Sequence, residues 1–282
     1  MNHTTFNFKS NDGLTLFSRI WLSTDPSPKA ILYLIHGLGE HTGRYAHVAD
    51  VLNQHGYHLT GFDLRGHGLS EGKRGHTPSY DYLLDDIQLF INECQNRLAG
   101  NLSGFLYGHS LGGNLVLSFG LQRSPDLSGF IATSPLIETA FAPPKIKLIA
   151  ARVLSQIMPT LTMKNGLERP ALSRDEAIVE AYESDPYVHD LLSARLGYDM
   201  LESGKSILEH APEWKFPLLL LHGSADRICS APASEAFAKA AGGTVDLVVR
   251  QDGYHELHND IGKDEVILEI VHWLDRLSTR SD

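Results

Sequence analysis

The sequence predicts an α/β fold in which a mostly parallel central sheet is flanked by helices and interrupted by a helical insertion. Short, continuously apolar runs alternate with helical patterns, which is typical of parallel strands that are buried on both faces. This alternation stops at about residue 136 and resumes at about residue 213. The composition is that of a globular protein, because 42% of the 282 residues are hydrophobic and 21% are charged.

The elements of the first half follow from their periodicity. Residues 4–8 and 14–22 flank an Asn-Asp-Gly turn, which predicts a hairpin. Continuous apolar runs predict buried strands at 30–35, 57–63, 104–109 and 127–134. Helical patterns lie between these runs at 44–55, after Thr77-Pro78, and at 111–122. We expect Pro78 at the first helical position, where its missing N–H costs no hydrogen bond.

The second half contains the insertion and the end of the sheet. Residues 136–212 predict irregular helical structure, including an apolar stripe formed by Ile146, Ile149, Val153 and Ile157. The strand rhythm then returns at 216–223 and 244–250, with helices expected at about 231–241 and 261–277. We therefore expect a core formed by residues 1–135 and 213–282, interrupted by one insertion at 136–212.

Charge, cysteine content and hydropathy exclude several classes of protein. The formal net charge of −10 argues against a nucleic-acid partner. Two cysteines, Cys94 and Cys229, cannot build a disulfide framework. The N-terminus carries no secretory signal pattern, and no apolar run approaches the ~20 residues of a membrane span. We expect a soluble, cytoplasmic enzyme or small-molecule-binding protein and leave its oligomeric state open.

The segment Gly108-His109-Ser110-Leu111-Gly112 carries the strongest chemical signal. A G-x-S-x-G motif between a predicted strand and a predicted helix is typical of a nucleophile elbow, in which a sharp turn projects the serine hydroxyl above the sheet. The helix that follows directs backbone N–H groups towards a developing oxyanion. We therefore predict Ser110 as a nucleophile.

A serine nucleophile requires a base that is itself oriented by an acid, and in this type of fold both follow the serine in the chain. Asp226 and His255 each lie just beyond a predicted strand, so we expect them to complete a catalytic triad. His258 is the alternative base. Asp252 is too close to His255 in sequence to approach it from a neighbouring strand, and the spacing of histidines does not match a metal motif.

The loop after the strand at 30–35 predicts the remaining part of an oxyanion hole. It reads His36-Gly37-Leu38-Gly39-Glu40, and its glycines allow the backbone to approach a substrate closely. We expect the backbone N–H groups of Leu38 and Leu111 to be the two donors. The alternative is that this His-Gly pair forms an ordinary turn.

Taken together, the chain resembles the monoacylglycerol lipase and lysophospholipase family of the α/β-hydrolase superfamily. The motifs that carry the resemblance span nearly the whole chain and occur in the family's order: HGLGEHTGRY (36–45), FDLRGHGLSEG (62–72), GHSLGG (108–113), YESDPYV (182–188), HGSADRICS (222–230) and GYHELH (253–258). The resemblance implies the α/β-hydrolase fold, the same triad and oxyanion hole, and a helical cap at 136–212 that forms an apolar acyl tunnel.

The resemblance also implies a polar end of the pocket that holds glycerol. We expect the substrate-binding residues there to be Gly37, Glu40, Arg44, His109, Tyr182 and His258. Four of them, Glu40, Arg44, Tyr182 and His258, match positions that line the family's pocket, and each has a structural alternative. Glu40 and Arg44, for example, are spaced to form a solvated i,i+4 pair. The stripe on 145–158 faces a lipid surface, the acyl tunnel or the core. Cys229, three residues after Asp226, matches a cysteine near the family's pocket.

The expected function is hydrolysis of monoacylglycerols through an acyl-enzyme, without a cofactor or a metal. The partner is a lipid ester, with transient contact between the cap and a membrane or micelle as a further expectation. The same mechanism also fits a lysophospholipase, a short- or medium-chain carboxylesterase or a serine aminopeptidase. A non-catalytic ligand-binding protein on this fold is the remaining alternative.

Overall fold

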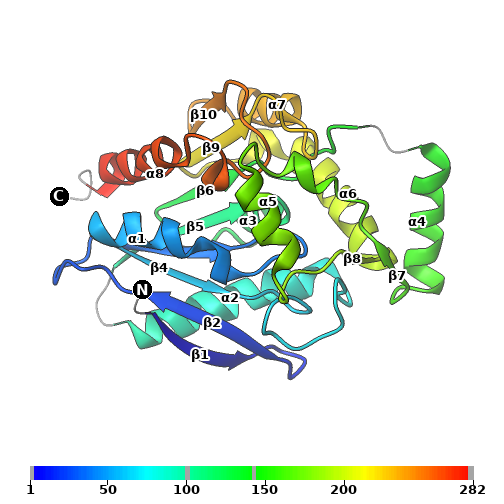
Figure 1. Ribbon diagram of the computed structural model, residues 1–282, viewed down its shortest axis with the longest axis horizontal. Coiled ribbons are helices and arrows are strands. Elements are labelled where there is room, and N and C mark those ends of the chain that lie inside the picture. Colours follow the sequence, from blue (N-terminus) through cyan, green and yellow to red (C-terminus); the bar gives the residue numbers. More distant parts are fainter. Residues whose placement is uncertain (1–2, 99–101, 142–143, 279–282) are drawn as a thin grey trace.

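The computed structural model describes residues 3–98, 102–141 and 144–278 (Figure 1). Its centre is an eight-stranded sheet with the strand order β1-β2-β4-β3-β5-β6-β9-β10. The strands are β1 (Thr4–Lys9), β2 (Thr15–Trp21), β3 (Ala30–Ile35), β4 (Tyr57–Phe62), β5 (Ser103–His109), β6 (Gly129–Thr133), β9 (Leu218–Gly223) and β10 (Val245–Arg250). Only the β1–β2 and β2–β4 pairs are antiparallel, which confirms the mostly parallel sheet.

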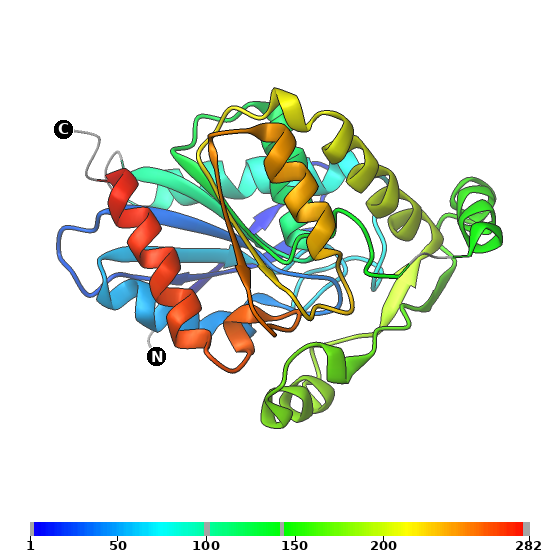
Figure 2. The same cartoon turned by 90° about the horizontal axis from the view of Figure 1, so that it is seen from above.

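Helices cover both faces of the sheet, and each face has its own apolar core (Figure 2). On one face lie α1 (Ala46–Gln54) and α8 (Lys263–Ser278). The other face carries α2 (Tyr80–Arg97), α3 (Leu111–Arg123) and α7 (Ala231–Ala241). The apolar stripe of α2, which includes Cys94, is fully buried. The continuous apolar runs of the central strands arise because side chains pointing either way enter a core.

The structure corrects one expected helix start. Pro78 does not occupy the first helical position, because α2 begins at Tyr80 and Ser79 is its N-cap residue. The hydroxyl of Thr77 donates to the carbonyl of Ser79 over 2.7 Å, and Ser79 has an extended backbone. This local turn delays the helix by two residues, so that Pro78 lies just before the cap.

The segment between β6 and β9 leaves the sheet and forms a separate group of helices beside it. It contains α4 (Lys145–Ile157), α5 (Glu176–Ser184) and α6 (Ala194–Glu209), and a short antiparallel pair formed by β7 (Thr162–Lys164) and β8 (Leu191–Ser193). Helix α6 packs against α3 of the core and against α4. Figure 1 shows α4 as the outermost element of this segment. Within the described part of the chain, no helix is long and apolar enough to span a membrane.

Candidate active site

Ser110 lies at the sharp turn between β5 and α3. Its backbone has φ 54° and ψ −114°, a conformation that a residue with a side chain rarely adopts. The turn is tight because α3 starts directly against the end of β3, where a Cβ on Gly112 would lie 2.0 Å from the carbonyl oxygen of Ile35. Such strain is typical of a nucleophile elbow, and it projects the Ser110 side chain into a cavity.

Asp226 and His255 come together beneath the same cavity. The Nδ1 atom of His255 donates to Asp226 Oδ2 over 2.8 Å, and both side chains are buried. The other carboxylate oxygen accepts the amides of Ile228 and Cys229 at 2.8 and 3.0 Å. His255 therefore keeps Nε2 for another partner. Among the described contacts no hydrogen bond joins Nε2 to Ser110, and such contacts commonly shorten only when substrate binds.

The charges of this pair influence each other strongly. Burial opposes protonation of His255, but the Asp226 carboxylate outweighs it and raises the pKa of His255 above its usual value of 6.5. Burial also opposes ionisation of Asp226, yet His255 and the hydrogen bonds to the carboxylate hold the pKa of Asp226 far below its ordinary value. Asp226 thus stays ionised and stabilises a proton on His255. A general base needs such support, because it must carry a proton briefly during the reaction.

Two backbone amides are free to hold an oxyanion beside Ser110. Within the described residues, the N–H groups of Leu38 and Leu111 donate to no protein acceptor, and both residues line the cavity. The N–H of Gly37 is different, since it donates to Oε1 of Glu40 over 2.6 Å. Glu40 therefore holds the loop that presents Leu38.

The polar end of the cavity is a group of buried charges. Arg44 lies between Glu40 and Glu256 and donates to both carboxylates at 2.7 Å. Tyr45 adds a hydrogen bond to Glu40 of 2.8 Å. Burial opposes ionisation of Glu40, but Arg44, His109, His36 and the Gly37 N–H together outweigh it and lower the pKa of Glu40 to about 2. Glu256 lines the cavity and was not expected from the sequence, although its position directly after His255 is the signal that could have found it.

The six expected substrate-binding residues fall into two groups. Gly37, Glu40, His109 and Tyr182 line the cavity. The Arg44 side chain is almost entirely buried between the two carboxylates, and its guanidinium lies 4.8 Å from the Tyr182 ring. It is therefore not solvated, and it does not line the cavity. His258 is also behind the cavity wall, with its ring 4.7 Å from that of Tyr45 and 4.8 Å from that of His109. Burial lowers the pKa of His109 to about 4, so it is neutral at pH 7.

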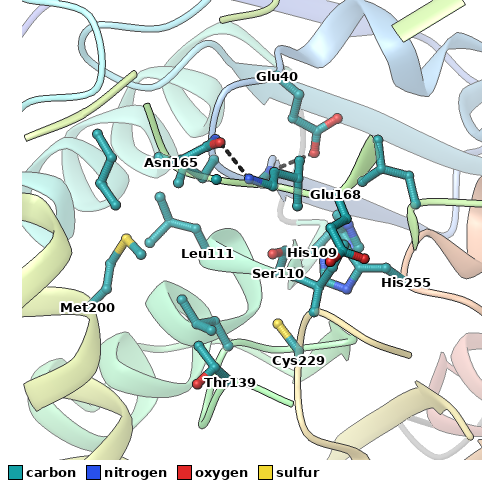
Figure 3. Close-up of a pocket in the computed structure, with 18 of the residues that line it drawn as sticks. Glu40, His109, Ser110, Leu111, Thr139, Asn165, Glu168, Met200, Cys229 and His255 are labelled. Carbon is teal, nitrogen blue, oxygen red and sulfur yellow. Dashed lines mark hydrogen bonds between the residues drawn. The ribbon is translucent and has the colours of Figure 1, made fainter. Parts of the chain in front are cut away.

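The rest of the cavity is lined mostly by apolar side chains, with Thr139, Asn165, Glu168 and Arg227 among them. Its volume is about 410 Å³, which falls in the range of small-molecule sites. The apolar lining comes from the core and from the segment between β6 and β9: Leu111, Leu136, Phe141, Leu167, Leu172, Leu192, Met200, Leu201 and Ile228. In Figure 3, Leu111 and Met200 lie on one side of Ser110 and His255 on the other, with Cys229 below the serine and Asn165 on the side of Leu111. The serine thus stands where the apolar and polar parts of the cavity meet.

The one cluster of the described residues that could offer ligands to a metal shares Asp226 and His255 with the expected triad. Ligand atoms of Asp226, Cys229 and His255 lie within 4.8 Å of one another. Burial raises the pKa of the Cys229 thiol well above its ordinary value, whereas a metal ligand must be a thiolate. The Asp226–His255 hydrogen bond also occupies the nitrogen and oxygen that would have to turn towards an ion. This donor set suits a catalytic pair better than a metal.

Comparisons with known proteins agree with this geometry. A family model described as serine aminopeptidase, S33, matches residues 26–262. The human monoglyceride lipase is 32% identical over 93% of this chain and 88% of its own length. An uncharacterized abhydrolase domain-containing protein of Dictyostelium discoideum is 36% identical over 97% of this chain, which spans only 29% of that relative. A crystal structure of the Paleococcus ferrophilus monoacylglycerol lipase superposes with a TM-score of 0.83, at 32% identity, covering 98% of this chain and 100% of that one.

Proposed function

The chain belongs to the α/β-hydrolases of the monoacylglycerol lipase type, and from this premise we propose that it is a serine hydrolase that splits monoacylglycerols into fatty acid and glycerol. The observation that carries the proposal is the division of the cavity at Ser110 into an apolar side and a polar end. An ester whose acyl chain lies on the apolar side and whose alcohol lies at the polar end places its carbonyl at the serine.

The proposed reaction has two steps. His255 takes the proton of Ser110 as Oγ attacks the ester carbonyl, and the oxyanion accepts the N–H groups of Leu38 and Leu111. The carbon–oxygen bond to glycerol then breaks, and His255 returns the proton to the leaving alcohol. A water molecule, deprotonated by His255, attacks the acyl-enzyme and releases the fatty acid with Ser110 restored. The chemistry requires no cofactor.

We assign the acyl chain to the cavity wall formed by residues 136–212, which act as a cap. Phe141, Leu192, Met200 and Leu201 come from this segment and line the same cavity as Leu111 and Ile228 of the core. Burial of a hydrocarbon chain there contributes about 0.8 kcal/mol for each CH₂ group removed from water. Longer acyl chains should therefore bind more tightly until the cavity is filled.

The buried charges of the polar end favour a neutral alcohol. Two carboxylates, Glu40 and Glu256, share the single guanidinium of Arg44, so an anionic phosphate headgroup would meet net negative charge. Hydroxyl groups of glycerol can exchange hydrogen bonds with these groups without bringing a charge. Monoacylglycerol is therefore favoured over a lysophospholipid.

A graded substrate panel tests the proposal. Hydrolysis of 1-acylglycerols should exceed that of alkyl esters of equal chain length, and a 1-acyl lysophospholipid should be the poorest of the three. Ser110→Ala should abolish hydrolysis while binding of a non-hydrolysable 1-acylglycerol ether is retained. Equal rates on acylglycerols and simple esters would reduce the function to that of a general carboxylesterase. A wild-type protein that binds the ether but hydrolyses no ester would instead be a ligand-binding protein.

A further inference from the structure

A second buried histidine lies behind Asp226. His222, in β9, has a completely buried side chain, and its Nε2 atom is 3.2 Å from Asp226 Oδ2 and 3.3 Å from the carbonyl oxygen of Cys229. Its Nδ1 atom is 2.8 Å from the hydroxyl of Ser234 in α7. Ser234 is buried as well. The ring is therefore fixed at both nitrogens between the helix and the expected catalytic acid.

The partners of His222 determine which nitrogen carries the proton. A carboxylate and a carbonyl can only accept, so Nε2 carries a hydrogen. Its hydrogen bond goes to the Cys229 carbonyl, with Asp226 Oδ2 beside it at 3.2 Å. In the tautomer that has its single hydrogen on Nε2, Nδ1 accepts from the hydroxyl of Ser234.

One oxygen of Asp226 is shared between two histidines. Oδ2 faces Nε2 of His222 and accepts the Nδ1 proton of His255, whereas Oδ1 is occupied by two backbone amides. A donor at Oδ2 draws on the same negative charge that attracts the proton of His255. The orientation of the carboxylate and the strength of its bond to His255 therefore both depend on His222.

We propose that His222, held by Ser234, is a positioning residue for ester hydrolysis: its Nε2–H, shared between the Cys229 carbonyl and Asp226 Oδ2, fixes the carboxylate and weakens its pull on the His255 proton. This inference rests on the proposed function, in which His255 is the general base. A base that held its proton too firmly would be protonated, and thus inactive, at neutral pH.

The other groups around the pair do not substitute for His222. His255 also faces His109, His258 and the carboxylates of Glu256 and Glu40, and Asp226 also faces the Cys229 thiol. Burial keeps His109, His258 and Cys229 neutral at pH 7, because it lowers the pKa of each histidine and raises the pKa of the thiol. Glu256 and Glu40 favour protonation of His255, and the amides of Ile228 and Cys229 occupy Oδ1. His222 is therefore the neighbouring side chain, besides His255 itself, that brings an N–H to Oδ2.

A matched pair of variants tests the inference. His222→Met and His222→Gln have side chains of similar length, but only glutamine offers an N–H to Asp226. We expect the acidic limb of the pH–rate profile to move upward by about half a unit to one unit in His222→Met, the equivalent of one hydrogen bond. It should stay near the wild-type position in His222→Gln. His58→Met, at a buried histidine near the other edge of the sheet, controls for loss of a buried ring.

Two measurements avoid dependence on the choice of substrate. The first is the rate at which a fluorophosphonate labels Ser110 as a function of pH, which requires only a reactive serine. The second is the NMR titration of the His255 ring, assigned by its loss in His255→Ala, which requires no reaction. Preference for simple esters over acylglycerols would overturn the proposed substrate and leave both readouts intact, so the two failures are distinguishable.

Ser234→Ala provides a milder test if the His222 variants do not fold. Removal of one buried oxygen leaves Nδ1 without its donor and loosens the ring, so the pKa of His255 should rise by less than in His222→Met but in the same direction. Unchanged titration of His255 in Ser234→Ala and His222→Met, or equal shifts in the methionine and glutamine variants, would overturn the role of the His222 N–H.

Discussion

The guanidinium of Arg44 and the carboxylate of Glu256 form a bidentate pair, with both nitrogen–oxygen distances at 2.7 Å. Arg44 follows β3 and Glu256 follows β10, so the pair joins two loops from different ends of the chain. Through Arg44, Glu256 also reaches Glu40, which in turn accepts the N–H of Gly37. The loop expected to bind the oxyanion is thereby tied to the residue next to His255.

Glu256→Gln tests this connection. The substitution removes a buried charge and one strong hydrogen bond from Arg44, and breaking a buried ion pair typically costs about 3–5 kcal/mol. We expect a loss of unfolding free energy of that order in urea denaturation and a reduced kcat on any ester. Arg97→Gln is the control, because the Arg97–Glu93 pair is exposed and such pairs contribute about 0–1 kcal/mol. Equal losses in the two variants would contradict the connection.

The pH dependence follows from the raised pKa of His255. Neutral His255 is the active form of a general base, so activity falls as pH drops through its pKa. Because the Asp226 carboxylate raises that pKa above 6.5, the acidic limb of kcat/KM should have its midpoint above pH 6.5. The measurement is hydrolysis of a non-ionisable ester between pH 5 and 9. Asp226→Asn should lose the upward shift, and a wild-type midpoint below 6.5 would contradict this view of the pair.

The fold was predictable wherever burial imposes a simple pattern. β3 is continuously apolar because both of its faces are buried, and the structure places its ends where the sequence does. β7 and β8 were not anticipated, because three residues of mixed exposure carry no periodicity. The stripe on α4 predicted a helix, but periodicity cannot say what covers a stripe. Its isoleucines are exposed rather than packed on the core.

Short motifs at strand ends suggested the residues of the candidate site. Ser110, Asp226 and His255 follow strand ends, and the geometry brings Asp226 and His255 into hydrogen-bond contact. Arg44 and Glu256 lie 212 residues apart, so their pairing depends on tertiary structure that no local pattern encodes. His258 occupies a short 3₁₀ turn after Glu256, which directs its ring behind the cavity wall instead of into it.

Gly39→Ala should damage catalysis through the position of the oxyanion loop. Gly39 has φ +80°, and an added Cβ would lie 2.3 Å from the carbonyl oxygen of His189. The loop must therefore shift and carry the Leu38 N–H away from the oxyanion. Loss of one such donor costs roughly 10²–10³ in kcat. Steady-state kinetics should show a kcat effect much larger than the KM effect.

Gly13→Ala is the matched control for Gly39→Ala. Gly13 also has a positive φ, of 87°, but an added Cβ there would meet nothing within 4 Å. That variant has only the backbone strain, on the order of 1 kcal/mol, and should keep its kcat. Similar kcat values for the two variants would show that the position of the Gly39 loop does not matter for the reaction.

The exposed stripe of α4 predicts how the protein meets lipid aggregates. Ile146 and Ile149 are 77% and 64% exposed, and the nearby Phe141 is both exposed and part of the cavity lining. A lipid surface that covers the stripe would deliver substrate next to the cavity. The net charge of −10 gives no attraction to anionic lipids, so we expect the contact to be apolar and local.

The double variant Ile146→Ser/Ile149→Ser should therefore lose activity only on aggregated substrate. Removing two exposed isoleucines makes transfer to a lipid surface less favourable by roughly 2 kcal/mol, which weakens partitioning about thirtyfold. Hydrolysis of 1-acylglycerol in phosphatidylcholine vesicles should fall, whereas hydrolysis of a soluble short-chain ester should not. Leu22→Ser is the control, because Leu22 is also exposed but lies outside residues 136–212. A stronger response to anionic than to zwitterionic vesicles, or equal losses on both substrates, would contradict an apolar lipid contact through α4.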